Sequence, residues 1–184
     1  MTTTYGVASP KRRCAMTTAA TQRHDKSYRA NASQFYVAAE LCRRGYAALV
    51  TIGNTPNTDI LCSNRSGTKF VHIQVKTFVP GNKTCSVGEK AEHSYGENFF
   101  WVLSGIPEPS QNAPYEFFVI PSAVMAENVK ERHDRWLETP GKDGRKHNHT
   151  SVRAVAVSKG VNDYHWPVIA YRDRWDLIEN KLAD

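Results

Sequence analysis

Residues 69 to 79, KFVHIQVKTFV, alternate between two kinds of side chain. Successive side chains of a strand point to opposite faces, so one face carries Val71, Ile73, Val75, Thr77 and Val79. The other face carries Phe70, His72, Gln74, Lys76 and Phe78. The pattern predicts a β-strand with one core-seeking face and one face whose polar groups need partners, because burying them unpaired is costly.

Apolar residues at three- and four-residue spacing predict a helix over residues 31–44. Its apolar stripe is expected to contain Phe35, Ala38, Ala39 and Cys42, flanked by Leu41. Asn31 or Ser33 is suited to cap its start, and Gly45 follows its end.

Short hydrophobic runs bounded by turn residues predict five strands before residue 122, at 46–52, 59–63, 69–79, 98–105 and 115–121. The loop NRSGT between the second and third of these is typical of a β-hairpin. A second helix is expected from Ser122 to Lys130, followed by a charged, loop-like stretch to Thr150. A strand at 151–158 and a short terminal helix within 171–182 complete the prediction.

The composition describes a single globular domain over residues 29–184. The absence of a run of about 18 apolar residues excludes a membrane-spanning protein. The net charge is +6, and residues 1–28 supply +4 of it, which predicts a disordered basic tail, with a transit peptide as the less favoured alternative. The four scattered cysteines form no metal-binding pattern or disulfide framework and favour reduced thiols in a cytoplasmic protein.

Three polar residues converge if the 59–63 and 69–79 strands pair as a hairpin. Asp59 at the start of one strand then approaches Gln74 and Lys76 on the later part of the other. A carboxylate and an amide oxygen are hard ligands suited to Mg²⁺, and a nearby lysine can serve an attacking water or offset phosphate charge. Glu40 lies off the apolar stripe of the preceding helix and is a fourth candidate.

In this region the chain resembles the PD-(D/E)XK nuclease superfamily. The helical Glu40, Asp59 at a strand start and Gln74-Val75-Lys76 on the next strand match the order of the motif, over about residues 31–125. The sequence departs from the family motif at Gln74, a position at which most members carry Glu or Asp. The resemblance implies an α/β, restriction-endonuclease-like core with a central mixed β-sheet flanked by helices, divalent-metal catalysis and a nucleic-acid substrate.

From the resemblance we expect a Mg²⁺-dependent endonuclease acting on DNA, with Mn²⁺ able to substitute and a homodimer as one possible assembly. Asp59, Gln74, the Val75 carbonyl and Glu40 are then the expected metal ligands. Lys76, Asp59, Gln74 and Glu40 are the expected catalytic set. Lys83, Lys90 and Arg43 are the expected phosphate contacts.

Each of these residues also has a structural interpretation. Glu40 can pair with Arg43 or Arg44, Asp59 can cap its own turn, and Lys76 can protect an edge strand. The RKHNHT segment at 145–150 lacks a ββα pattern and is interpreted as a solvated loop. Two other functions therefore stay open: a catalytically silent nuclease fold that binds nucleic acid, and a protein-binding accessory module.

Overall fold

The structure, a computed structural model, describes Met1 and residues 26–52 and 55–183. The expected tail therefore falls almost wholly outside the described residues, although residues 26–28 already belong to a helix. The helices are α1 (Lys26–Arg43), α2 (Ser122–Glu138) and α3 (Asp176–Leu182). Each helix of the described ranges is too short or too polar to cross a membrane.

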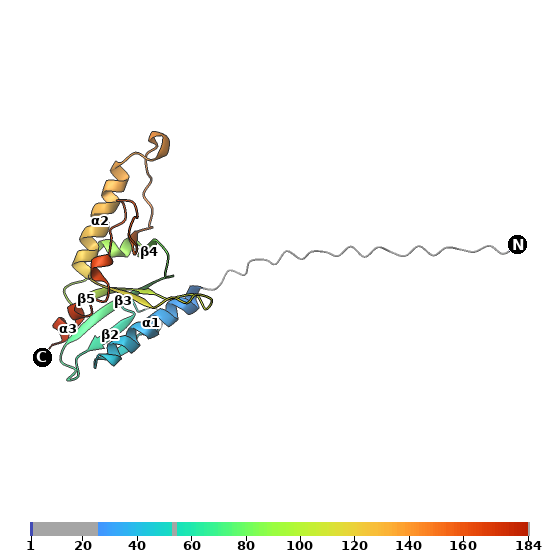
Figure 1. The fold of residues 1–184 in the computed structure, drawn as a ribbon. Coiled ribbons are helices and arrows are strands. Elements are labelled where there is room, and N and C mark those ends of the chain that lie inside the picture. The colour runs from blue at the N-terminus through green and yellow to red at the C-terminus, as the bar shows by residue number, and fades with distance from the viewer. Residues whose placement is uncertain (2–25, 53–54, 184) are drawn as a thin grey trace.

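The strands are β1 (Ala47–Val50), β2 (Ile60–Ser63), β3 (Phe70–Phe78), β4 (Thr84–Ser86), β5 (Phe99–Gly105), β6 (Glu116–Pro121) and β7 (Ala154–Ala156). Three short 3-10 helices are η1 (Glu89–Glu92), η2 (Lys142–Gly144) and η3 (Ile169–Tyr171). Five of the strands form one mixed sheet in the order β1-β2-β3-β5-β6, in which β3 and β5 are parallel and the other pairs are antiparallel (Figure 1). The expected α/β class and mixed sheet are confirmed.

The predicted hairpin is present between β2 and β3. Ile60 lies opposite Ile73, and the side chain of Asn64 closes the loop by accepting the N–H groups of Thr68 and Lys69 at 2.9 and 3.0 Å. Because β2 begins opposite Ile73, the rest of β3 runs on past the start of its neighbour. We call residues 74–78 of β3, which extend past β2, the overhang. On the side where β2 would pair with it, the backbone of the overhang has no strand partner among the described residues and can contact side chains instead.

Helices α1 and α3 cover one face of the sheet, where the β-branched face of β3 packs as predicted (Figure 1). Val37 and Leu41 of α1 meet Ile73 and Val75 of β3 in this core. The expected stripe on α1 is only partly right, since Phe35 is 63% exposed, and Ala39 and Cys42 are exposed as well. The helix is apolar on two adjacent faces, and the sheet selects the one that contains Val37 and Leu41. Asn31 and Ser33 are not caps, because α1 begins at Lys26.

Helix α2 and the small β4-β7 sheet pack on the other face of the main sheet, around Trp101, Phe118 and Met125. In Figure 1, α2 rises away from the main sheet, and η2 follows a few residues after its end at Glu138. The helix continues to Glu138, so the stretch expected to be loop-like from residue 131 is helical in its first part. Its charged residues point outward, while Val129 and His133 are buried on the inner side.

Two predictions for strands differ from the structure in this region. The strand expected at 151–158 is reduced to β7, and its partner β4 lies in the segment expected to be a polar loop. With only three residues, β4 lacks a recognisable alternation, although its central Cys85 is buried.

Candidate active site

The carboxylate of Asp59 lies in the space that the overhang of β3 leaves open. The backbone of Asp59 continues the β2-β3 ladder, since its N–H donates to the Ile73 carbonyl at 2.9 Å. Its Oδ2 accepts the N–H of Val75 at 2.7 Å and also a hydrogen bond from Nε2 of Gln74. The hairpin register therefore brings Asp59 and Gln74 into direct contact.

The Val75 backbone faces the same space. An extended residue directs its N–H and C=O to the same side of the strand, and the N–H of Val75 reaches Asp59. The carbonyl of Val75 therefore also points towards the overhang. One carboxylate, one side-chain amide and one backbone carbonyl converge there.

A second glutamine reaches Asp59 from the helix. Nε2 of Gln34 donates to Oδ1 of Asp59 at 3.2 Å, so both carboxylate oxygens are engaged. Gln34 is not one of the candidate residues of the sequence. It precedes Ala38 by four positions and Leu41 by seven, so it lies on the same side of the helix as these two residues, which pack on the sheet. This spacing is the sequence signal that indicates a side chain facing the sheet.

Burial raises the pKa of Asp59 above its ordinary value of 3.8. The N–H of Val75 and the charges of Lys76 and Lys90 act in the opposite direction without reversing the effect. The neighbouring N–H group and lysines therefore do not fully offset the cost of burying the ionised Asp59 carboxylate. Additional positive charge beside it would stabilise the ionised form.

Lys76 lies on the same face of β3 as Gln74, with its Nζ 6.0 Å from the ring centroid of Trp101. Its charge acts on Asp59, as does that of Lys90 in η1. Asp59 and Gln74 are thus in direct contact, while Lys76 and Lys90 act on Asp59 through their charge alone. The side chain of Lys83, also selected from the sequence, is exposed on the loop before β4.

Glu40 lies elsewhere, at the carboxyl end of α1. Its two oxygens accept hydrogen bonds from Arg43 at 2.7 and 2.8 Å and from Arg44 at 2.8 Å, and Arg44 also pairs with Glu179 of α3. These bonds, from Arg43 first, hold the pKa of Glu40 below its ordinary value of 4.5. Arg43, an expected phosphate contact, is likewise engaged in this ion-pair network.

Helix geometry explains why Gln34 and not Glu40 contacts Asp59. The two residues are six positions apart, which corresponds to about 9 Å along the axis and to different sides of the helix. In the described ranges, no group of three or more His, Cys, Asp or Glu side chains is arranged to hold a metal ion. Any metal here would depend on Asp59 and on neutral oxygens.

The fold is similar to that of a bacterial homing endonuclease, I-Ssp6803I. The two structures match with a TM-score of 0.50 over 86% of this chain and 95% of the other, at 14% sequence identity. The restriction-endonuclease-like fold expected from the sequence is therefore confirmed, and at this identity the likeness concerns the fold alone. No protein-family model and no curated protein matches the chain.

Proposed function

We propose that this protein is a metal-dependent endonuclease that hydrolyses DNA phosphodiester bonds. The observation that carries the proposal is the contact of Asp59 with Gln74 and with the N–H of Val75, where β3 overhangs β2. The shared fold with a homing endonuclease supports it, because that protein's own name assigns it a nuclease activity.

The residues at the overhang fit a divalent cation such as Mg²⁺. The Asp59 carboxylate, the Val75 carbonyl and, after rotation of its amide, Oε1 of Gln74 are the hard oxygen donors that Mg²⁺ prefers. Mg²⁺ binds through few protein groups and keeps several waters, so three donors are sufficient. When bound, it would supply charge stabilisation to the phosphoryl oxygens, and Mn²⁺ suits the same donors.

Lys76 is the residue that we assign to assist hydrolysis. It lies on the polar face of β3 and its charge acts on Asp59, so it can orient the attacking water and offset negative charge on the phosphate. Glu40 has no part in the proposal, because it is ion-paired with Arg43 and Arg44 and lies six positions beyond Gln34, the α1 residue that contacts Asp59.

Exposed cations on the segment that follows β3 suit the phosphates of a DNA substrate. Lys90 acts on Asp59 through its charge, and Lys83 is exposed between β3 and β4. Such contacts position the nucleic acid without reading its sequence. Cutting both strands of a duplex would require a second active site, which a homodimer would provide.

The test is cleavage of supercoiled, linear and branched DNA by the full chain with Mg²⁺, with Mn²⁺ and with EDTA. We expect cleavage that requires the metal and that Lys76→Ala reduces by about 10²-fold or more. Lys69→Ala, which removes a lysine just before β3, is the matched control and should cleave normally. Activity that persists in EDTA, or that survives in Lys76→Ala, would overturn the proposal.

A catalytically silent nuclease fold that binds nucleic acid is the second candidate. It is favoured by the side chains that contact Asp59, which are two neutral amides. Salt-sensitive DNA binding without cleavage of any DNA form would select this function. Absence of binding as well as of cleavage would favour a protein-binding module.

A further inference from the structure

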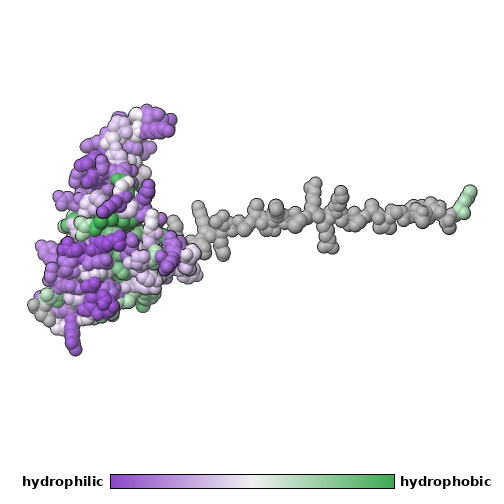
Figure 2. All heavy atoms as spheres, viewed as in Figure 1, coloured by the Kyte–Doolittle hydropathy of each residue, from purple (hydrophilic) through white to green (hydrophobic). Residues whose placement is uncertain are grey.

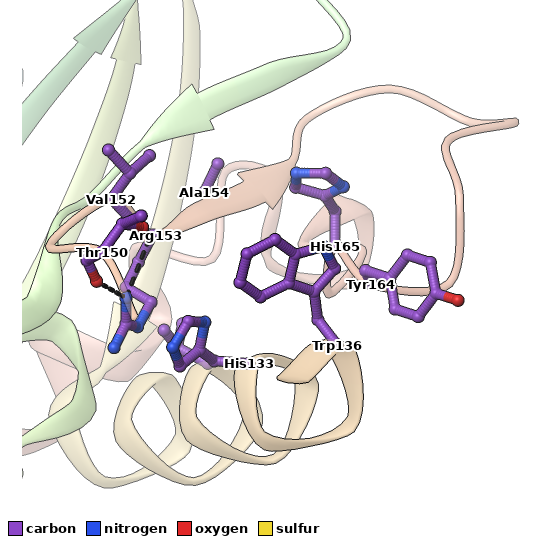
Figure 3. Close-up of a pocket in the computed structure, with 9 residues that line it drawn as sticks. His133, Trp136, Thr150, Val152, Arg153, Ala154, Tyr164 and His165 are labelled. Carbon is purple, nitrogen blue, oxygen red and sulfur yellow. Dashed lines mark hydrogen bonds between the residues drawn. The ribbon is translucent and has the colours of Figure 1, made fainter. Parts of the chain in front are cut away.

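A pocket lies between the second half of α2, the segment around β7 and the loop before Trp166. Its volume is about 220 Å³, well above the ~10–15 Å³ that one water requires. The lining residues are Val129, His133, Trp136, Thr150, Val152, Arg153, Ala154, Tyr164 and His165 (Figure 3). The cavity is large enough for a small organic group, and its residues belong to elements other than those that hold Asp59.

A buried nitrogen without a partner lines this pocket. His133 is 8% exposed, and its Nε2 has no hydrogen-bond partner within the described part of the chain. Burial lowers the pKa of His133 below its ordinary 6.5, and the charge of Arg153 acts in the same direction. The neutral imidazole offers one donor and one acceptor, so a ligand with a matching polar edge would remove the cost of the unpaired nitrogen.

Arg153 does not make the pocket a site for an anion. It is 6% exposed, its Nε bonds to Glu92, and its Nη1 donates to the carbonyls of Thr150 and Val152 at 2.6 and 2.9 Å. The charge is therefore neutralised by an ion pair and its donors are largely engaged. The polar part of the cavity suits a neutral ligand better than a phosphate.

Aromatic rings form much of the lining. Trp136 stacks on His147 with 4.0 Å between ring centroids and on His133 with 5.5 Å. His165, from the loop before Trp166, lies beside Trp136, while the ring of the neighbouring Tyr164 points away (Figure 3). Flat aromatic surfaces favour flat heterocycles, whatever their substituents. Shape and polarity thus point to the same class of ligand.

The segment that follows α2 carries exposed positive charge. Lys142, Arg145 and Lys146 are exposed in and after η2, at the end of α2. Figure 2 shows this tip as hydrophilic. His147, which directly follows Lys146, stacks on Trp136 of the lining, so these cations suit the phosphates on either side of a bound base.

We propose that this pocket binds a single unstacked nucleobase. His133 hydrogen-bonds to the polar edge of the base, the aromatic lining that includes Trp136 packs around it, and the cations that follow α2 contact the flanking phosphates. The site depends on the proposed function only in taking a nucleic acid as ligand, and it does not require cleavage. The base comes from a free nucleotide, from a single strand or from a duplex that releases it from the stack.

The test uses the full chain in EDTA, so that a failure of cleavage and a failure of base binding are distinguishable. The probes are the four deoxynucleoside monophosphates, deoxyribose 5-phosphate as the base-free control, a short single strand, and duplexes with 2-aminopurine at successive positions. We expect binding of base-bearing probes, a shift of the His133 Nε2 resonance on binding, and no binding of the sugar phosphate at the same concentration.

Trp136→Ala should weaken binding of the best probe about tenfold or more. Tyr28→Ala, which removes a ring exposed on α1, is the matched control and should bind normally. Equal binding of the sugar phosphate, normal binding by Trp136→Ala, or failure of every base-bearing probe would overturn the proposal. The His133 resonance tests the pocket in the unchanged protein, so the result does not depend on how well a variant folds.

Discussion

Gln34 donates a hydrogen bond from Nε2 to Oδ1 of Asp59 at 3.2 Å, which joins the middle of α1 to the start of β2. The other oxygen of Asp59 accepts from Gln74 and from the N–H of Val75. One carboxylate thus lies between two amides, at the point where we propose that a divalent cation binds. Metal affinity should therefore depend on the charge at these two glutamine positions.

Gln34→Glu should strengthen metal binding, because it adds a second carboxylate beside Asp59. Without metal the two charges repel, so the melting temperature should fall in EDTA and recover with Mn²⁺ more than in the unchanged protein. Asn31→Glu places the same charge on an exposed part of α1 and is the matched control. Equal Mn²⁺-dependent shifts in the two variants would contradict this prediction.

Gln74→Glu should lower the Mg²⁺ concentration at which cleavage is half-maximal. The new carboxylate takes the place of an amide that contributes no charge, on the strand that carries Lys76. The measurement is a Mg²⁺ titration of plasmid cleavage, with Gln74→Ala expected to need more metal than the unchanged protein. A midpoint that does not move in Gln74→Glu would indicate that this side chain is not a ligand.

Asp59→Ala and Asp59→Asn should separate the structural role of this side chain from its metal-binding role. Alanine leaves the N–H of Val75 without its acceptor, at a cost of about 1–3 kcal/mol in the free energy of unfolding. Asparagine keeps an oxygen for that N–H and should be more stable than alanine in urea, yet both variants should lose cleavage. Normal cleavage by Asp59→Asn would exclude this carboxylate as the metal ligand.

The hairpin register is the part of the site that the sequence predicts well. Alternation along residues 69–79 and a turn-rich loop before it determine which face Gln74 occupies and which strand end it meets. The contact of Asp59 with Gln74 follows from that register alone. Local periodicity and turn chemistry are sufficient for such a contact, because only a short loop separates the strands.

The helical contribution to the site could not be predicted in the same way. α1 is apolar on two adjacent faces, and only its packing against the sheet decides that Val37 is buried and Phe35 is exposed. The rotation of the helix in turn decides whether Gln34 or Glu40 faces Asp59. Tertiary packing also extends α2 through a charged stretch, because the buried Val129 and His133 anchor one side of it.

Glu40→Gln should destabilise the protein at neutral pH and make no difference in acid. Glu40 pairs with Arg43 and Arg44, and Arg44 connects to Glu179 of α3, so the charge contributes below about 1 kcal/mol at this partly exposed site. Because its pKa is lowered from 4.5 on folding, this contribution is present above that pH and is lost as pH falls through the lowered value. The measurement is the difference in urea midpoint between Glu40→Gln and the unchanged protein, followed from neutral to acidic pH. Glu127→Gln, at an exposed position of α2, is the control. A difference in urea midpoint that stays constant down to the most acidic pH would show that the arginines do not stabilise the Glu40 carboxylate.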